Sequence, residues 1–600
     1  MNERRYYIIG VVVILPLIYI VKLFGLQVID DTYRQEAEKN IIDREVKYPY
    51  RGLIYDRNGE LLVYNEPVYD LEVIPREASI NDTARFCAIF GITRNELKNK
   101  LEQAKNYSPV KPSVVIEKIS NKRFAGIQDQ LNNFPGFRVK ARTQRAYPHS
   151  SLANALGYTG EISKAQLVKD TTNYYSQGDF IGISGIEAKY EPSLRGKLGV
   201  EYKLVNVMGV EQGSFKNGLY DTTSRPGIDL ISSIDLELQK YGERLMNGKT
   251  GSIVAIEPET GEILAMVSAP SYDPNLLTGK DFGKNYTRLS ADTSKPLFVR
   301  PTMAMYPPGS MFKTVQSLIA LQEDVIGPDD RIYCSGSLIG DHAPPGYYNI
   351  TKGIRLSSNN FFYKVFRRII NQNESSNTYV DSRLGLEKWY EYIKAFGMGH
   401  KLSVDIPSEK SGYVPTPAYY DRIYGENRWK FSTIYSLSIG QGELLVTPVQ
   451  MANLAATIAN KGYFYTPHLV KGIGEDNITP AAFSEKNYTG VDSVHFNVVQ
   501  DAMEEVVLYG TGQYRAKLKD ISVCGKTSTV ENPHGEDHSG FMAFAPKENP
   551  KIAIAVYVEN AGQGARAAAS IASLMIEKYI KGGTDRPWIE EYALKGDFIY

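Results

Sequence analysis

Residues 251–269 read GSIVAIEPETGEILAMVSA, and this stretch decides the fold. Two apolar runs, 251–257 and 261–269, lie on either side of Pro258-Glu259-Thr260-Gly261, whose residue types are typical of a tight turn. Each run has the length of a strand and is rich in aliphatic side chains. We therefore expect two neighbouring strands joined by that turn.

Three more strands are expected near the C-terminal end, over 521–529, 540–545 and 551–559. Helices are expected over 234–246 and, with a strongly amphipathic pattern, over 565–580. The residues between the two groups of strands are rich in helix and loop signals. Together these elements predict an α+β domain, with a five-stranded antiparallel sheet flanked by helices and a helical insertion.

The N-terminal half carries a different pattern. Residues 51–63 predict two short strands around Asn58-Gly59, a pair that supplies the two positive φ angles of a two-residue hairpin turn. A helix is expected over 93–104 and a strand over 138–140. Residues 213–229 are rich in Gly, Ser, Thr and Pro, as a domain boundary is. We therefore expect one domain over 30–225, a second over 230–585, and a tail over 586–600.

The N-terminus predicts a membrane location. Arg4 and Arg5 precede an almost wholly apolar run, 8–21, and residues 6–29 are long enough to span a bilayer. No small-x-small cleavage pattern follows, so an uncleaved anchor over 8–29 is favoured over the alternative of a cleaved signal peptide. Positive charge ahead of the helix places the tail 1–7 in the cytoplasm and the rest of the chain on the outer side.

The composition argues against several classes of protein. The sequence contains 68 Lys and Arg residues and 68 Asp and Glu residues, so its formal net charge is zero. A chain without excess positive charge is not expected to bind nucleic acid by neutralising phosphates. Three cysteines are too few for a disulfide framework or a four-cysteine zinc site. The loop 534–538 and the group Cys334, Asp341 and His342 contain metal-binding residue types without the usual zinc spacing. We expect neither a metal nor a cofactor.

Candidate chemistry begins at residues 307–314, PPGSMFKT. Pro and Gly before a helix start place Ser310 in the first turn, with Lys313 one turn later on the same face. A lysine desolvated in a pocket loses its proton near neutral pH and then serves as a base for the serine. Taken alone, the pair is also consistent with a helix cap and a solvated lysine. The same spacing from Ser108 to Lys111 is a chance match, because neighbouring prolines make a helix implausible.

Two further groups strengthen this hypothesis. Residues 357–359 place Ser357 and Asn359 on a loop before an aromatic helix, although the next residues, Ser358 and Asn360, fit the same spacing. Residues 523–529, VCGKTST, place Lys526 and several hydroxyl groups on a late strand. A serine with a lysine, a serine with an asparagine, and a Lys-Thr strand make the constellation of penicillin-binding proteins and serine β-lactamases.

The sequence resembles the class B penicillin-binding proteins, in their elongation branch, over nearly the whole chain. The resemblance includes the anchor, RGLIYDRNG at 51–59, PGF at 135–137, RAYP at 145–148 and LRG at 194–196. It continues with 251–256, 260–266, YPPGS at 306–310, IGQG at 439–442 and TP at 447–448. The resemblance implies a non-catalytic pedestal (dimerisation-type) domain over 30–225 and a transpeptidase domain over 230–585.

The catalytic roles follow from this resemblance. Ser310 would attack the carbonyl of the penultimate D-Ala of a peptidoglycan stem peptide, and Lys313 would take its proton. Ser357 would relay a proton to the leaving D-Ala amine, and Asn359 would hold the peptide amide. An amine of a neighbouring stem peptide would then resolve the acyl-enzyme, and β-lactams would trap Ser310.

The same resemblance implies how the third motif binds substrate. Lys526 and Thr527 would receive the terminal carboxylate, and the backbone N–H groups of Ser310 and Thr529 would form an oxyanion hole. Ser528 stands where the family usually has glycine, on the same strand face as Lys526. We expect its hydroxyl to narrow the groove or to bond the ligand. A literal Lys249-Thr250-Gly251 precedes the nucleophile, contrary to the family's order, and is interpreted as a decoy.

The partners implied by the resemblance are stem peptides, β-lactams, and the membrane-embedded glycosyltransferase of the elongation machinery, which pedestal and anchor would contact. The implied location is the cytoplasmic (inner) membrane, with the catalytic domain in the periplasm or outside. Two other functions remain open: a weakened scaffold or β-lactam sensor, motivated by Ser528, and a carboxypeptidase or β-lactamase that uses water as acceptor.

Overall fold

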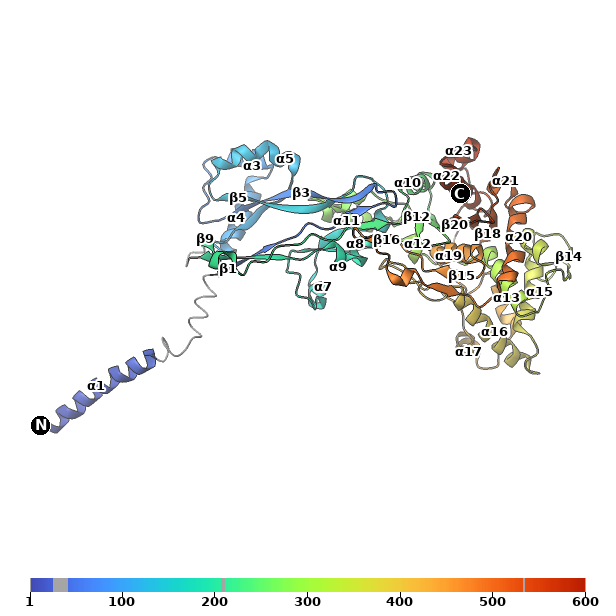
Figure 1. The fold of residues 1–600 in the computed structure, drawn as a ribbon, viewed down its shortest axis with the longest axis horizontal. Helices are drawn as coiled ribbons and strands as arrows, with labels where there is room; N and C mark the ends of the chain where they lie inside the picture. The colour runs from blue at the N-terminus through green and yellow to red at the C-terminus, as the bar shows by residue number, and fades with distance from the viewer. Residues whose placement is uncertain (1, 25–41, 207–210, 533–534, 599–600) are drawn as a thin grey trace. The chain divides into compact units, whose positions relative to one another are not determined.

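The computed structural model describes residues 2–24, 42–206, 211–532 and 535–598 (Figure 1). The chain forms two compact units. Unit 1 comprises 1–51, 66–144 and 195–227, and unit 2 comprises 52–65, 145–194 and 228–600. The units are discontinuous in sequence, because two segments of the N-terminal half, 52–65 and 145–194, belong to unit 2.

Unit 2 is built on one five-stranded antiparallel sheet in the order β12-β11-β20-β19-β18. Its members are β11 (Gly251–Ile256), β12 (Ile263–Ala269), β18 (Cys524–Val530), β19 (His538–Ala545) and β20 (Ile552–Val558). These are the two early and three late strands that the sequence predicts. The late strand β20 pairs with the early strand β11, so the long insertion leaves the sheet at β12 and returns at β18.

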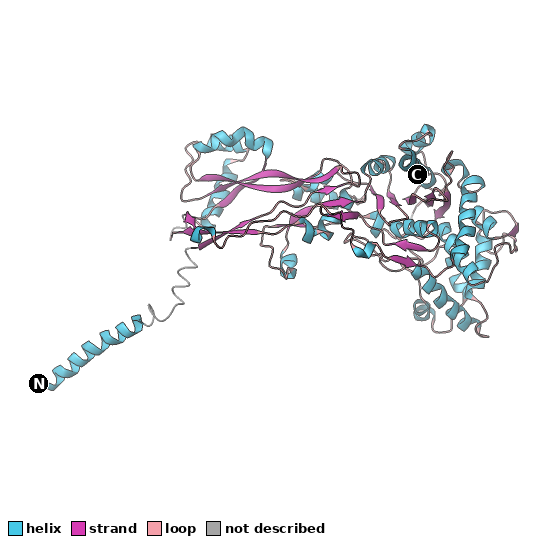
Figure 2. Cartoon of the chain, viewed as in Figure 1, coloured by secondary structure: helices cyan, strands magenta, loops and turns pink. Residues whose placement is uncertain are grey.

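The central strands are buried on both faces because each face carries its own layer of helices (Figure 2). Val254 and Ile256 of β11 belong to one core, together with α13 (Lys313–Gln322) and α19 (Pro448–Ala459). The alternate residues Ile253 and Ala255 belong to a second core, with α10 (Leu236–Leu245) and α22 (Ala568–Lys581). Burying one such aliphatic side chain contributes about 1.5–3 kcal/mol. Both helices expected beside the sheet, α10 and α22, are therefore present.

The insertion brings the three motif segments together beside β18. The short 3-10 helix η5 (Gly309–Phe312) contacts β18 and leads directly into α13. Helix α13 packs on α15 (Asn359–Ile370), which begins at the second motif, while α20 (Ser493–Tyr509) packs on β18. Segments more than 200 residues apart in sequence thus become neighbours, as the labels α13, α15, α20 and β18 in Figure 1 indicate.

The hairpin at 51–63 forms, but its predicted turn is wrong. Strand β2 (Ile54–Tyr55) pairs with the start of β3 (Leu61–Val73). Gly59 has a positive φ of 88°, whereas Asn58 does not adopt one. The Asp56 carboxylate accepts hydrogen bonds from the backbone N–H groups of Asn58 and Glu60, each at 2.8 Å. Because this carboxylate satisfies the loop amides, the turn closes with one left-handed residue instead of two.

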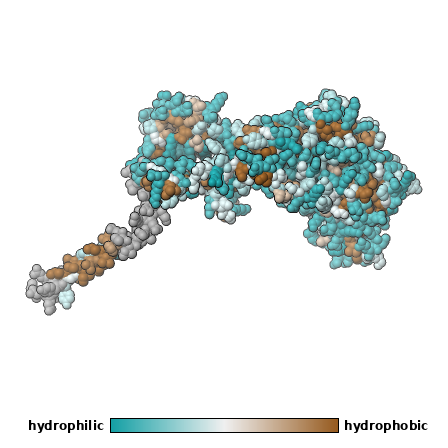
Figure 3. All heavy atoms as spheres, viewed as in Figure 1, coloured by the Kyte–Doolittle hydropathy of each residue, from teal (hydrophilic) through white to brown (hydrophobic). Residues whose placement is uncertain are grey.

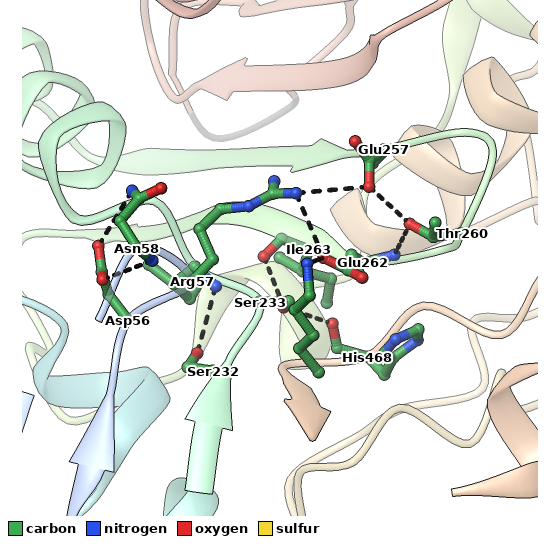
Figure 4. A network of polar contacts seen from close by, with 12 residues as sticks. Asp56, Arg57, Asn58, Ser232, Ser233, Glu257, Thr260, Glu262, Ile263 and His468 are labelled. Carbon is green, nitrogen blue, oxygen red and sulfur yellow. Dashed lines mark hydrogen bonds and ion pairs between the residues drawn. The ribbon is translucent and has the colours of Figure 1, made fainter. Parts of the chain in front are cut away.

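Arg57 ties this hairpin to the central sheet of unit 2 (Figure 4). Its Nη2 atom lies 3.5 Å from Oε2 of Glu257 and 3.3 Å from Oε2 of Glu262, two carboxylates that flank the β11–β12 turn. The Thr260 hydroxyl donates to Glu257 in the same turn at 2.9 Å. The predicted turn at 258–261 therefore carries an ion-pair network as well as joining two strands.

Unit 1 contributes strands to two further sheets. One includes β3 beyond residue 65, β4 (Ser113–Ser120) and β5 (Phe137–Ala146), and packs against α3 (Thr83–Phe90) and α4 (Arg94–Tyr107). Thr93 and Glu96 form a capping box at the start of α4, which accounts for the helix expected from residue 93. The other sheet has the order β1-β8-β9, formed by β1 (Ile42–Lys47), β8 (Gly199–Val205) and β9 (Glu211–Ser214).

The N-terminal helix α1 (Asn2–Phe24) covers much of the predicted anchor, whose residues 25–29 lie outside the described residues. Within the ranges that the structure describes, no helix combines the length and the apolar character that crossing a bilayer requires. The described part of α1 exposes a continuous apolar surface (Figure 3).

Candidate active site

Ser310 sits in η5, held by backbone contacts. The sequence predicts an α-helical first turn, but the chain forms a 3-10 turn before α13 begins at Lys313. Gly309 has a positive φ of 55°, and its N–H donates to the Gly440 carbonyl at 2.9 Å. Ser310 is half-buried, and its hydroxyl has no hydrogen-bond partner among the described residues. The backbone of this turn therefore sets the position of the Ser310 hydroxyl.

The Lys313 amine is fully buried and points to the second motif. Its Nζ atom donates to the Ser357 carbonyl and to Asn359 Oδ1, each at 2.6 Å, and lies 3.2 Å from Ser357 Oγ. Burial lowers the pKa of Lys313 to about 7, against the opposing effect of the Asp341 carboxylate. The neutral Lys313 amine has two protons, which it can donate to the Ser357 carbonyl and to Asn359 Oδ1. Its lone pair then remains able to accept the proton of a hydroxyl group.

A second buried amine converges on the same serine. Lys526 Nζ, from β18, donates to Ser357 Oγ at 2.9 Å and to the Thr527 carbonyl at 3.0 Å. Burial, reinforced by the nearby charge of Lys313, lowers the pKa of Lys526 well below its usual value. Ser357 itself has a positive φ of 57°, a strained backbone conformation that costs about 1–3 kcal/mol. Such strain is typical of functional sites.

The structure separates the two registers that the sequence left open for the second motif. Ser357 and Asn359 contact the buried lysine amines, as described above. Ser358 and Asn360 are fully buried and bond the Asp341 carboxylate instead. The Ser358 hydroxyl lies 2.7 Å from Asp341 Oδ2, and the Asn360 backbone N–H lies 2.8 Å from the same atom. The second pair therefore holds the loop that presents the first pair.

The other third-motif residues lie on β18 beside Lys526. Thr527 is mostly buried, and its hydroxyl lies 2.6 Å from that of Thr511, a residue that the sequence did not single out. Thr529 is exposed, and its Oγ1 accepts a hydrogen bond from the Gly564 N–H at 3.2 Å. Ser528 is 1% exposed, and its hydroxyl donates to the Pro308 carbonyl at 2.9 Å. The Ser528 hydroxyl therefore contacts the turn that contains Ser310, while its expected contact with a ligand stays a prediction.

Lys249 and His538, which belong to two of the discounted candidates, make other contacts. The Lys249 amine donates to the Asn247 carbonyl and lies over the Phe598 ring. His538 Nδ1 accepts from the Asn560 N–H, while residues 533–534 of the histidine-containing loop lie outside the described residues. Among the residues that the structure describes, no three His, Cys, Asp or Glu side chains are grouped to hold a metal ion.

The position of Lys313 predicts the pH dependence of acylation. If the neutral amine is the base, acylation by a penicillin requires deprotonated Lys313, whose pKa is about 7. The rate should therefore rise about tenfold from pH 6 to pH 8 and level off above. Quenched-flow measurement with fluorescent penicillin checks this. A rate that falls over the same interval would contradict a neutral Lys313 as the base.

Asp341 provides a second prediction. Its burial alone would raise the pKa, but hydrogen bonds from the Asn360 backbone and the Ser358 hydroxyl outweigh burial and lower the pKa of Asp341. We expect Asp341→Asn to loosen the second-motif loop and slow acylation about tenfold. It should also move the midpoint of the pH profile to lower pH, because the Asp341 charge raises the Lys313 pKa. An unchanged midpoint would contradict this coupling; Asp330→Asn is the control.

Comparison with known proteins agrees with this geometry. A family model of the penicillin binding protein transpeptidase domain matches residues 251–577, and one of the penicillin-binding protein dimerisation domain matches residues 46–231. The peptidoglycan D,D-transpeptidase MrdA of Acinetobacter baumannii is 30% identical over 94% of this chain and 86% of its own length.

Two solved structures are also similar. Penicillin-binding protein 2 of Helicobacter pylori, in complex with MreC, has a TM-score of 0.73 and 26% identity, covering 90% of this chain and 99% of that one. A chain of a peptidoglycan synthase complex that coordinates polymerization and crosslinking has a TM-score of 0.71 and 26% identity. The match covers 97% of this chain and 99% of that one. The chain therefore belongs to the penicillin-binding protein transpeptidase family.

Proposed function

We propose that this protein is a peptidoglycan D,D-transpeptidase that cross-links stem peptides through an acyl-serine intermediate at Ser310. One observation carries the proposal: two fully buried lysine amines, Lys313 and Lys526, converge on the Ser357 hydroxyl at 3.2 and 2.9 Å beside the half-buried Ser310. Burying an amine costs free energy, so two buried amines at one hydroxyl point to a functional site, and an activated serine needs an adjacent base of this kind.

Acylation uses Lys313 as the base. The neutral amine takes the proton of the Ser310 hydroxyl while Oγ attacks the carbonyl carbon of the penultimate D-Ala. As the tetrahedral intermediate collapses, the peptide C–N bond breaks and Ser357 passes a proton to the departing D-Ala amine. That proton is replaced from the amines that Ser357 contacts, Lys313 and Lys526. Asn359 holds the peptide amide, while Lys526 and Thr527 attract the terminal carboxylate.

Deacylation reverses these steps with a new amine. An amine of a neighbouring stem peptide loses a proton to the same relay and attacks the ester carbonyl, which forms the cross-link and returns the proton to Ser310. A β-lactam offers a strained amide to Ser310 but leaves its own amine tethered to the acyl group. The acyl-enzyme is then blocked, which makes β-lactams inhibitors and labels of this site.

The proposal includes an anchor in the cytoplasmic membrane over residues 8–29, with the tail 1–7 inside and the catalytic domain in the periplasm or outside. Support comes from the exposed apolar side chains on all sides of the described part of α1, since so large an apolar surface marks a lipid or protein contact. The pedestal domain over 30–225 and the anchor would contact a membrane-embedded glycosyltransferase of the elongation machinery. Similar proteins have been solved in complex with MreC and in a peptidoglycan synthase complex, which supports partners of this kind.

The function is tested with the full chain in detergent, a stem-peptide thioester as donor and a D-amino acid as amine acceptor. We expect a new amide product whose yield rises with acceptor concentration, and no turnover by Ser310→Ala. Release of acid alone at every acceptor concentration would indicate a carboxypeptidase or β-lactamase-type hydrolase. No turnover by the folded parent would indicate a scaffold or sensor.

A further inference from the structure

Ser528 occupies an unusual place in the site. It lies on the same face of β18 as Lys526, two residues on, but its hydroxyl is turned to the turn that carries the nucleophile. The acceptor, the Pro308 carbonyl, belongs to the residue just before η5, two residues before Ser310. Side chain and carbonyl are both sequestered from solvent, since Ser528 is 1% exposed and Pro308 is buried.

The surroundings of Ser528 are shaped by glycine. A Cβ atom at Gly309 would lie 2.3 Å from Ser528 Oγ, so only glycine at 309 leaves room for this hydroxyl. Across the strand pair, Ser528 faces Gly540, and a Cβ there would lie 3.4 Å from Ser528 Cβ. The Ser528 side chain therefore fits between η5 and β19, where residues 309 and 540 are both glycine.

The turn carrying Ser310 is held on two sides. The Ser528 hydroxyl bonds the Pro308 carbonyl at 2.9 Å, and the Gly440 carbonyl bonds the Gly309 N–H at 2.9 Å. Between these two restraints the backbone is fixed immediately before Ser310. Because the Ser310 hydroxyl has no partner among the described residues, this backbone decides where the attacking oxygen lies.

We propose that Ser528 is a positioning residue for the nucleophile: through its hydrogen bond to Pro308 it sets the direction of Ser310 Oγ toward the acyl carbonyl. The inference rests on the proposed function and deepens it, because it assigns the third-motif serine to the enzyme's own turn rather than to the ligand. A misplacement of the attacking oxygen slows the acylation step more than it weakens binding.

The test is acylation of the full chain in detergent by fluorescent penicillin, with the dissociation constant Ks and the acylation rate constant k2 measured separately. We expect Ser528→Ala to lower k2 about tenfold and to change Ks less than about twofold. Ser528→Thr keeps a hydroxyl that can donate to the Pro308 carbonyl, so it should recover most of k2. Ser528→Gly is the second variant without the hydroxyl, should Ser528→Ala not fold.

Ser232→Ala is the matched control. Ser232 is also fully buried and also donates to a main-chain carbonyl, that of Leu469 at 2.8 Å, so its loss should cost stability while leaving k2 unchanged. Equal k2 for the parent and the Ser528 variants without a hydroxyl would overturn the positioning role, as would an equal loss of k2 in Ser232→Ala. If the parent takes no label at Ser310, the proposed function fails and the Ser528 assignment falls with it.

Discussion

Replacing Lys313 by methionine is expected to slow acylation of Ser310 by about 10²- to 10⁴-fold, the usual contribution of a positioned general base. The methionine side chain has similar length and lacks the amine that contacts Ser357 and Asn359. The substitution also removes a buried titratable group, so the remaining slow reaction should lose its dependence on pH near 7. Quenched-flow labelling with fluorescent penicillin between pH 6 and pH 8.5 measures both effects.

The matched control is Lys364→Met. Its amine belongs to α15 and donates to the Tyr333 carbonyl, a solvent-exposed contact, so acylation should stay within about twofold of the parent. A Lys313→Met protein that acylates at the parent rate would contradict the assignment of Lys313 as the base. Retention of the pH profile with a reduced rate would instead place the titrating group elsewhere.

The second large effect concerns stability. Arg145 Nε lies 2.7 Å from Glu187 Oε1 in unit 2, with side chains 1% and 0% exposed. Arg145→Met removes the cation that the buried Glu187 carboxylate contacts at 2.7 Å, and we expect the free energy of unfolding to fall by about 3–5 kcal/mol. All three tryptophans, Trp389, Trp429 and Trp588, belong to unit 2, so urea titration followed by tryptophan fluorescence reports on this unit.

Two variants sharpen this measurement. Arg145→Met combined with Glu187→Met should be more stable than Arg145→Met alone, because it removes the buried negative charge together with the positive one. Lys240→Met breaks an exposed ion pair with Glu237 and should change stability by less than about 1 kcal/mol. An Arg145→Met protein as stable as the Lys240→Met protein would contradict the structural role of the buried pair.

Much of the fold was predictable because it depends on local patterns. The runs 251–257 and 261–269 form β11 and β12 because continuous aliphatic stretches suit strands covered by helices on both faces. The turn after Tyr55 was not predictable from its Asn-Gly pair alone. The carboxylate of Asp56 bonds the loop amides and changes the turn, and the sequence pattern gives no measure of that competition.

Some residues of the candidate site could likewise be predicted from local sequence patterns, and others could not. Ser310, Lys313 and Lys526 could be singled out in the sequence because each lies in a short motif whose residue types and spacing are typical of acyl transfer. Asp341 and Thr511 were not assigned to this site, since they meet it only through contacts between distant segments. The orientation of Ser528 was also hidden: strand alternation predicts its face, but its hydrogen-bond partner depends on how closely η5 approaches β18.

Locating the penicillin adduct by peptide mass spectrometry tests the central claim most directly. Trypsin should release residues 289–313 as one peptide, because prolines follow Lys295 and Arg300. The account predicts one penicilloyl group on this peptide, localised by fragmentation to Ser310 and absent from Ser290 and Ser294. An adduct on any other residue, or an unmodified peptide from folded protein treated with excess penicillin, would contradict it.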